Sequence, residues 1–116
     1  MSNTRVTHLA GGGLLELHDP WIPAAEAEAL FAALRDGLAW KQESIRIFGR
    51  EHLQPRLSAW YGDAGTVYTY SGLTLEPAPW TAELAALRAR VEDSSRSRFN
   101  SVLANLYRDG QDAMGF

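Results

Sequence analysis

The sequence contains no cysteine, which excludes disulfides, thiolate metal sites and cysteine nucleophiles together. It contains no run of eighteen apolar residues, and its N-terminus lacks the basic region followed by an apolar stretch that marks a secretory signal. We therefore expect no membrane partner and a cytoplasmic protein. The net charge of −3 provides no overall excess of positive charge for non-specific binding to nucleic acid.

The composition that remains is typical of one soluble globular domain. The chain has 116 residues, of which 46% are hydrophobic and 22% charged. Three consecutive glycines at 11–13 indicate a flexible leader over residues 1–13. The domain is therefore expected over residues 14–116, beginning with a short strand that Asp19 and Pro20 end.

Two segments have the period of an amphipathic helix. Over residues 24–36, apolar residues recur at i, i+3, i+4 and i+7, with Pro23 suited to the first turn and Gly37 to the C-terminal cap. A second helix is predicted over residues 82–92, with Thr81 as its N-cap. The residues expected to face the core are Ala27, Leu30, Phe31 and Leu34 in the first helix and Leu84, Leu87 and Val91 in the second.

Strands are predicted where aromatic and β-branched residues alternate with polar ones, near residues 39–47, 53–60 and 66–70 and again over 98–108. Phe48-Gly49-Arg50 lies between the first two, where a turn tip is expected. The predicted fold class is α+β, with two helices on a mainly antiparallel sheet.

Positive charge is concentrated in one short stretch of the chain. Residues 41–56 hold four basic side chains against two acidic ones. Taken alone, such a stretch is more often a set of solvated strand edges than a binding surface. The four basic residues are Lys41, Arg46, Arg50 and Arg56.

Two segments resemble a known family. They read PRLSAWYGDAGTVYTYSGLTLEPAPW, from Pro55 to Trp80, and RFNSVLANLYRDGQDAMG, from Arg98 to Gly115. Both resemble the AlkB-like dioxygenases, most closely the DNA-repair branch, and the similarity extends from about residue 14 to the end. The resemblance implies two N-terminal-side helices on a partial double-stranded β-helix, or jelly-roll, sheet. It also implies an enzyme that uses iron(II) and 2-oxoglutarate to dealkylate N-alkylated nucleobases in DNA oxidatively, which is a DNA-repair function.

The family resemblance assigns a cosubstrate role to two residues of the last strand. In the family, an N-x-Y pattern supplies an amide and a hydroxyl to 2-oxoglutarate, and here it falls on Asn105 and Tyr107. Residues two apart on a strand project to one face, which suits joint binding of one ligand. The alternative is that Asn105 satisfies a nearby backbone group and Tyr107 is an amphipathic core residue.

The segment YTYSG resembles the nucleobase pocket of the family, which places Tyr68, Tyr70 and Ser71 around an extruded, alkylated base. Aromatic faces stack on any base, and a positively charged alkylated base adds cation–π attraction. The alternative is a cross-strand aromatic pair that only stabilises the sheet.

Ile47-Phe48-Gly49 resembles the hairpin finger with which family members that act on duplex DNA enter the base stack. An apolar wedge offsets part of the cost of unstacking, and Phe48 is the candidate wedge. The four basic residues Lys41, Arg46, Arg50 and Arg56 then become candidate phosphate contacts beside it. Alkylated DNA is therefore the expected partner, with duplex preferred over single strand. The alternative is a Phe48 side chain that folds back on its own strands.

The sequence departs from the family pattern at its C-terminal end. The pattern continues in the family into a histidine, a spacer and an aspartate, two of the iron ligands, whereas this sequence ends at Phe116. None of His8, His18 and His52 is followed two residues later by a carboxylate. We therefore expect a chain truncated just before the H-x-D motif, without metal-binding or catalytic residues, inactive in isolation and not binding iron.

A C-terminal half that completes the barrel is then a further expected partner. Two other interpretations stay open at this point. The chain could be a non-catalytic nucleic-acid-binding module, which predicts salt-sensitive binding without turnover. It could also be an inert truncated fragment.

Overall fold

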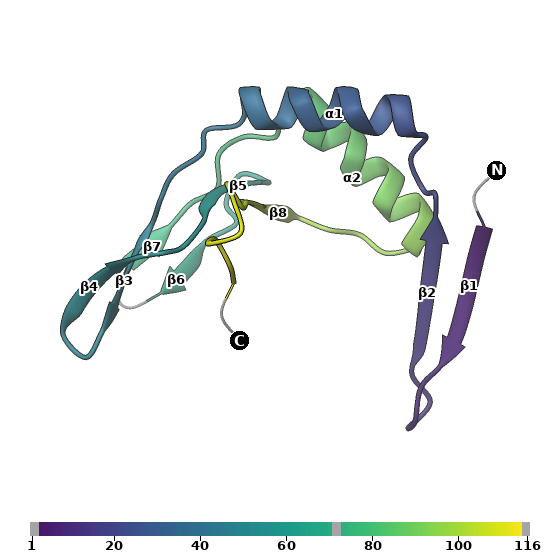
Figure 1. Ribbon diagram of the computed structural model, residues 1–116, viewed down its shortest axis with the longest axis horizontal. Coiled ribbons are helices and arrows are strands. Elements are labelled where there is room, and N and C mark those ends of the chain that lie inside the picture. Colours follow the sequence, from purple (N-terminus) through teal and green to yellow (C-terminus); the bar gives the residue numbers. More distant parts are fainter. Residues whose placement is uncertain (1–2, 71–72, 115–116) are drawn as a thin grey trace. The chain divides into compact units, whose positions relative to one another are not determined.

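A computed structural model describes residues 3–70 and 73–114 of the chain (Figure 1). The elements follow in the order β1, β2, α1, β3, β4, β5, β6, β7, α2, β8. The chain divides into two compact units, one ending at Asp36 and one beginning at Gly37. Within the described residues, no helix is long and apolar enough to cross a membrane.

The first unit consists of a hairpin and a helix. Strand β1 (Asn3–His8) pairs antiparallel with β2 (Leu14–Asp19), and Gly11 and Gly12 adopt positive φ angles in the connection. The glycines thus form a turn between two strands, and the leader expected over residues 1–13 contains a strand that the sequence did not predict. The division into leader and domain stays a prediction.

Helix α1 (Ala24–Gly37) confirms the helix predicted over residues 24–36. Its backbone hydrogen bonding begins at Pro23, whose carbonyl oxygen accepts from the Ala27 amide at 2.9 Å. Three of its four expected core-facing side chains are half-buried. The fourth, Phe31, is 58% exposed, so the apolar face of α1 is narrower than its period suggests.

The second unit opens with a short hairpin, β3 (Ser44–Ile47) and β4 (Arg50–Leu53), paired from Ser44↔Leu53 to Ile47↔Arg50. The turn predicted at Phe48-Gly49-Arg50 is therefore a two-residue turn of Phe48 and Gly49. Two strand predictions were wrong in extent. The first strand is shorter than 39–47, and the single strand expected over 53–60 is interrupted around Pro55, which has no amide hydrogen for a ladder.

The central pair of the second unit is β5 (Leu57–Gly62) and β8 (Ser101–Leu106), antiparallel from Leu57↔Leu106 to Gly62↔Ser101. One face of this pair holds buried Ala59 and Tyr61, each 6% exposed. The Tyr61 hydroxyl accepts a hydrogen bond from the Ala39 amide at 2.8 Å. Gly62 permits a close approach, because a Cβ there would lie 2.8 Å from the Asn100 carbonyl oxygen.

A second hairpin, β6 (Tyr68–Tyr70) and β7 (Leu73–Leu75), precedes α2 (Ala82–Ser95). The predicted N-cap is confirmed, since the Thr81 hydroxyl accepts from the Leu84 amide at 3.2 Å. The helix extends three residues beyond the predicted end at 92. Of its expected core residues, Leu84 is 4% exposed and Leu87 half-buried, whereas Val91 is 38% exposed.

Two helices and antiparallel strand pairs confirm the α+β class. Within the described residues, the strands form four two-stranded sheets, β1–β2, β3–β4, β5–β8 and β6–β7. Isolated bridges from Lys41 to Ser58 and from Tyr61 to Ala78 join segments outside the strands to β5. The strand β5 is therefore the element around which the second unit is organised.

Candidate functional site

The β5–β8 pair has one face that is open to solvent. Residues directly opposite each other in an antiparallel pair project to the same face. The pairs Ser58↔Asn105 and Trp60↔Leu103 thus lie on the side opposite buried Ala59. Leu103 is 56% exposed, and Ser58, Trp60 and Asn105 are half-buried. We call Ser58, Trp60, Leu103 and Asn105 the open face.

Asn105 is a polar residue of the open face whose side chain has an identified hydrogen-bond partner. Its Oδ1 accepts a hydrogen bond from Arg56 Nε at 3.2 Å. Arg56 immediately precedes β5 and is two residues before Ser58. Because side chains alternate between the two faces of a strand, the Arg56 side chain lies on the same face as Ser58. Tyr107 follows the last residue of β8 and is 46% exposed. The structure therefore joins Asn105 to Arg56, and no described hydrogen bond joins it to Tyr107.

The loop after β8 has a compact internal structure. Arg108 Nε and Nη2 donate to the two carboxylate oxygens of Asp112 at 2.7 and 3.0 Å, and the Arg108 amide donates to Oδ2 at 2.9 Å. The hydrogen bonds from Arg108 hold the pKa of the Asp112 carboxyl group below its ordinary value. The loop returns to the start of β5, because the Ala113 amide donates to the Pro55 carbonyl oxygen at 2.8 Å.

An aromatic pair lies at the edge of the open face. The rings of Trp60 and Tyr68 meet edge to face, with centroids 6.3 Å apart and an interplanar angle of 76°. Tyr68 is 55% exposed. The sequence prediction missed Trp60, although the alternation in Ser58-Ala59-Trp60-Tyr61 places it on the face opposite Tyr61. Of the other predicted pocket residues, only the strand position of Tyr70 is described, and Ser71 lies outside the described residues.

The tip of the β3–β4 hairpin projects an apolar side chain into solvent. Phe48 is fully exposed, at 101%, and Ile47 is 45% exposed. Phe48 and Gly49 have φ angles of 50° and 75°. Positive φ at both central residues is the requirement of the type I′ turn that suits a two-residue hairpin. A bulky residue adopts this conformation rarely.

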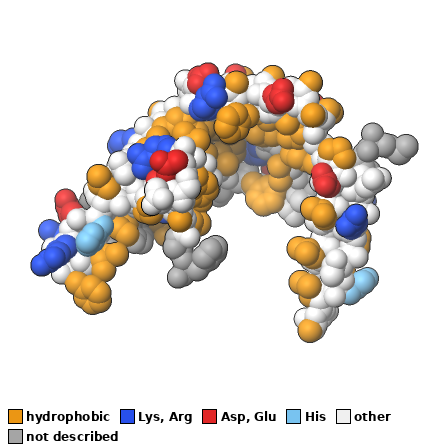
Figure 2. Space-filling model, viewed as in Figure 1, with side chains coloured by type: hydrophobic (Ala, Val, Ile, Leu, Met, Phe, Trp, Pro, Cys, Tyr) orange, Lys and Arg blue, Asp and Glu red, His pale blue; other side chains and the backbone are white. Residues whose placement is uncertain are grey.

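Basic side chains lie beside this tip. Figure 2 shows hydrophobic side chains at the end of the β3–β4 hairpin, with Lys and Arg side chains next to them. The side chains of Arg46 and Arg50 make no hydrogen bond or ion pair with another described residue, whereas the side chain of Arg56 bonds to Asn105. The interpretation of Phe48 as folded back on its own strands does not agree with its full exposure. Its contact with DNA stays a prediction.

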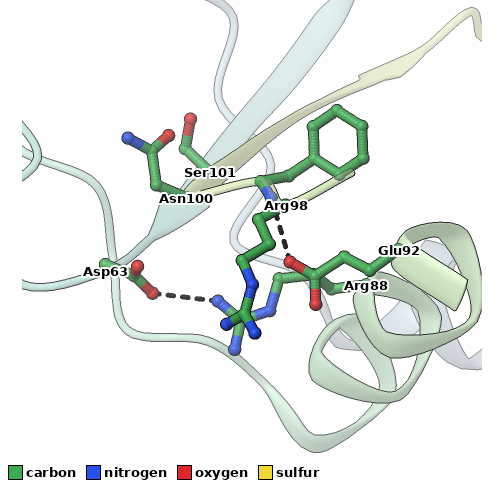
Figure 3. Close-up of a pocket in the computed structure, with 7 residues that line it drawn as sticks. Asp63, Arg88, Glu92, Arg98, Asn100 and Ser101 are labelled. Carbon is green, nitrogen blue, oxygen red and sulfur yellow. Dashed lines mark hydrogen bonds and ion pairs between the residues drawn. The ribbon is translucent and has the colours of Figure 1, made fainter. Parts of the chain in front are cut away.

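A separate pocket of about 590 Å³ lies at the other end of the β5–β8 pair (Figure 3). Asp63 anchors it, accepting from Trp80 Nε1 and from Arg88 Nη1, each at 2.9 Å. Both hydrogen bonds lower the pKa of the Asp63 carboxyl group, and the bond from Trp80 has the larger effect. The Arg88 guanidinium also lies 4.3 Å from the Trp80 ring centroid. Glu92 accepts from the Phe99 amide at 2.9 Å.

Three of the four charged side chains that line this pocket are bonded within the protein. Asp63 and Arg88 pair with each other, and Glu92 is bonded to the backbone ahead of β8. Together they fasten α2 to the ends of β5 and β8. We therefore assign the pocket a structural role, which could not be predicted from the sequence because Asp63 and Arg88 are 25 residues apart.

The described residues do not fit an iron site. They contain no group of three or more histidine, aspartate and glutamate side chains that could hold a metal ion. His18 Nδ1 lies 3.3 Å from the Thr4 hydroxyl and its Nε2 lies 3.4 Å from Glu16 Oε2. This leaves a single carboxylate near that imidazole, on an exposed hairpin.

Comparison with known proteins connects these features to a family. No family model matches the sequence. The chain is 40% identical over 111 residues to the DNA oxidative demethylase ALKBH2 of Mus musculus, an alignment that covers 93% of this chain and 46% of the relative. It is 38% identical over 111 residues to ALKBH2 of Homo sapiens, covering 93% and 42%. It is 37% identical over 99 residues to the human alpha-ketoglutarate-dependent dioxygenase alkB homolog 3, covering 84% and 34%.

Identity of this level over most of the chain shows that it belongs to the AlkB-like dioxygenases. The resemblance stated from the sequence is therefore confirmed. The chain spans less than half the length of each of these relatives.

Proposed function

We propose that the chain forms the N-terminal part of an iron(II)- and 2-oxoglutarate-dependent dioxygenase that removes alkyl groups oxidatively from nucleobases in DNA. The observation that carries the proposal is the open face, where Asn105 and the aromatic rings of Trp60 and Tyr68 border one exposed sheet surface. The relatives are named as DNA oxidative demethylases and as an alpha-ketoglutarate-dependent dioxygenase, which supports the same reaction class.

The donors at the end of the open face fit an anionic cosubstrate. Asn105 uses its oxygen for Arg56, so its Nδ2 hydrogens are directed elsewhere, and Tyr107 adds a half-exposed hydroxyl. A carboxylate or a keto oxygen accepts hydrogen bonds from both kinds of donor. We assign 2-oxoglutarate to Asn105 and Tyr107. The described residues themselves contain no group of side chains that fits iron.

Tyr68, with Tyr70 and Ser71 beside it in sequence, is proposed to border the alkylated base. The edge-to-face contact between the Trp60 and Tyr68 rings restricts the tilt of the tyrosine ring, and a ring of fixed tilt loses less entropy when a base stacks on it. A base can reach this surface only when it leaves the duplex.

The finger supports a preference for duplex DNA. Phe48, with Ile47 and Gly49 around it, is proposed to fill the space left by the extruded base, and Arg50 to contact a phosphate nearby. Arg56 was predicted as a second phosphate contact, which stays a prediction, but its guanidinium is engaged with Asn105.

A second sheet is proposed to cover the open face and to complete a jelly-roll barrel. Leu103 is 56% exposed beside Trp60, and apolar side chains in this position are normally covered in a folded domain. We propose that this cover comes from a C-terminal segment that also carries the iron ligands. The chain alone is then expected to show no turnover.

The test supplies a C-terminal segment that carries the H-x-D motif and the remaining iron ligand, and measures formaldehyde release from N1-methyladenine DNA. We expect activity that depends on iron and 2-oxoglutarate. Asn105→Ala and Tyr107→Phe should raise the KM for 2-oxoglutarate, whereas Asn100→Ala, on the far end of the pair, should not. Activity of the 116-residue chain alone, or restored activity indifferent to both variants, would contradict the proposal.

A second candidate is a non-catalytic nucleic-acid-binding module. The full exposure of Phe48 beside Arg46 and Arg50 favours it, because these groups need no iron to bind DNA. Salt-sensitive binding of duplex DNA by a protein that stays inactive after a C-terminal segment is supplied would support this candidate over the enzyme.

A further inference from the structure

The guanidinium of Arg56 is placed to control the orientation of a neighbouring amide. We propose that Arg56 is a positioning residue that fixes the Asn105 side chain so that its NH2 group, and not its oxygen, is presented to the 2-oxoglutarate carboxylate. This inference rests on the proposed function, because it concerns the same cosubstrate site.

An asparagine side chain can present either of two groups to a ligand. Rotation by half a turn exchanges a carbonyl oxygen, which only accepts, for an NH2 group, which only donates. An anion is bound by the second arrangement and repelled by the first. The orientation is set by the other hydrogen bonds that the amide makes.

In the structure, Arg56 Nε donates to Asn105 Oδ1 at 3.2 Å. A guanidinium has donors and no acceptor, so the exchanged arrangement would lose this bond and set two donors against each other. A hydrogen bond to a charged group is also stronger than one between neutral groups. The Asn105 oxygen is therefore held toward Arg56, and its NH2 group is turned away.

The Arg56 guanidinium is also held in place by the loop that follows β8. Pro55 accepts from the Ala113 amide at 2.8 Å, which fastens the loop after β8 to the residue preceding Arg56. Arg56 Nη1 in turn donates to the Ala113 carbonyl oxygen at 3.4 Å, a longer and weaker bond. The Arg108–Asp112 pair stiffens the same loop. Arg56 thus joins the loop to Asn105.

The first experiment is a double-mutant cycle on the unfolding of the 116-residue chain without ligand. It uses Arg56→Met, which keeps an aliphatic side chain and removes the donors, together with Asn105→Ala and the double variant. We expect the two sites to be coupled by a factor of about five or more in the unfolding equilibrium constant. Arg98→Met is the control, because Arg98 carries the same charge at the other end of β8. Independent effects of Arg56→Met and Asn105→Ala would overturn the proposal.

The second experiment titrates the same four proteins and the unmodified chain with 2-oxoglutarate, and follows binding by NMR through the backbone amide signals around residue 105, which all five proteins retain. Arg56→Met should weaken binding about five-fold or more, and Arg98→Met should leave it unchanged. In the Asn105→Ala background, Arg56→Met should have no further effect, because a positioning residue acts only through the group it positions.

Three other outcomes have separate meanings. A full further loss in the double variant would show that Arg56 binds the ligand directly, which overturns the positioning role. Equal weakening of 2-oxoglutarate binding by Arg56→Met and Arg98→Met would show that only the overall positive charge matters, which also overturns the positioning role. If the unmodified chain and Asn105→Ala respond alike to 2-oxoglutarate, the cosubstrate assignment itself fails. A coupled unfolding cycle would then show that the contact exists without this ligand, so that the failure belongs to the proposed function.

Discussion

Replacing Phe48 by asparagine should raise the free energy of unfolding of the protein and lower its affinity for duplex DNA. Phe48 has φ 50° and is fully exposed, so it has an unfavourable backbone conformation without a compensating contact in the fold. The left-handed conformation costs a bulky residue on the order of 1–2 kcal/mol. Asparagine tolerates it, and Asn-Gly is a preferred pair for a type I′ turn. We expect Phe48→Asn to raise the free energy of unfolding by about 0.5–1 kcal/mol.

The binding measurement should move in the opposite direction. If Phe48 enters the base stack, its removal loses stacking of about 1–3 kcal/mol, which weakens binding to a duplex about five-fold or more. A single strand of the same sequence, whose bases are already unstacked, should bind almost unchanged. Fluorescence anisotropy with labelled oligonucleotides and urea denaturation give the two quantities on the same preparations.

Leu53→Ala is the matched control, because Leu53 is 64% exposed at the open end of the same hairpin. Leu53→Ala should change the free energy of unfolding by no more than a few tenths of a kcal/mol. It should leave the preference for duplex over single-stranded DNA unchanged. A loss of stability in Phe48→Asn would show that the phenylalanine packs in the fold. Equal loss of binding on duplex and single strand would remove the finger assignment.

Three further changes test the fold that supports the site. Gly62→Ala should lower the free energy of unfolding by about 1–3 kcal/mol, because its Cβ would lie 2.8 Å from the neighbouring backbone; Gly110→Ala, with open space around it, is the control in urea denaturation. Leu84→Ala should cost about 2–5 kcal/mol and Val91→Ala much less, in the same assay, since their exposures are 4% and 38%. The lowered pKa of Asp63 means that its stabilising bonds are present above the ordinary pKa and are lost as the pH falls through the folded value. Denaturation across pH 6 to about 2 should therefore show less loss on acidification in Asp63→Asn than in the unmodified chain.

The helices and one hairpin tip were predictable from the sequence because local signals determine them. The helical period and the Thr81 cap need only neighbouring residues, and both helices begin where they were expected. Phe48-Gly49 contains a glycine between two alternating segments, and it forms the expected turn. Each of these features depends on contacts within a few residues along the chain.

The features that were missed depend on how strands pair or on contacts between residues far apart in the sequence. Strand β1 was read as leader because three glycines suggest flexibility, whereas the structure uses Gly11 and Gly12 in the turn of a hairpin. The alternation within β5 places Trp60 on the face opposite Tyr61, but its position beside Leu103 depends on the register of β5 against β8, which cannot be read from either strand alone. The bond from Arg56 to Asn105 spans 49 residues. No local sequence pattern predicts a hydrogen bond between residues this far apart.

The open face connects the stability of the fold with the chemistry proposed for it. Leu103 and Tyr68 are each more than half exposed, so in this structure the donors and rings beside them face water. Hydrogen bonds to an anion are worth far more in a site from which water is excluded, since the effective dielectric constant is lower there. The apolar side chains of the face gain free energy from the same removal of water. A segment that covers Leu103 would therefore strengthen both the folding of β5–β8 and the binding of an anion at Asn105, and the two gains should appear together in any protein in which this face is covered.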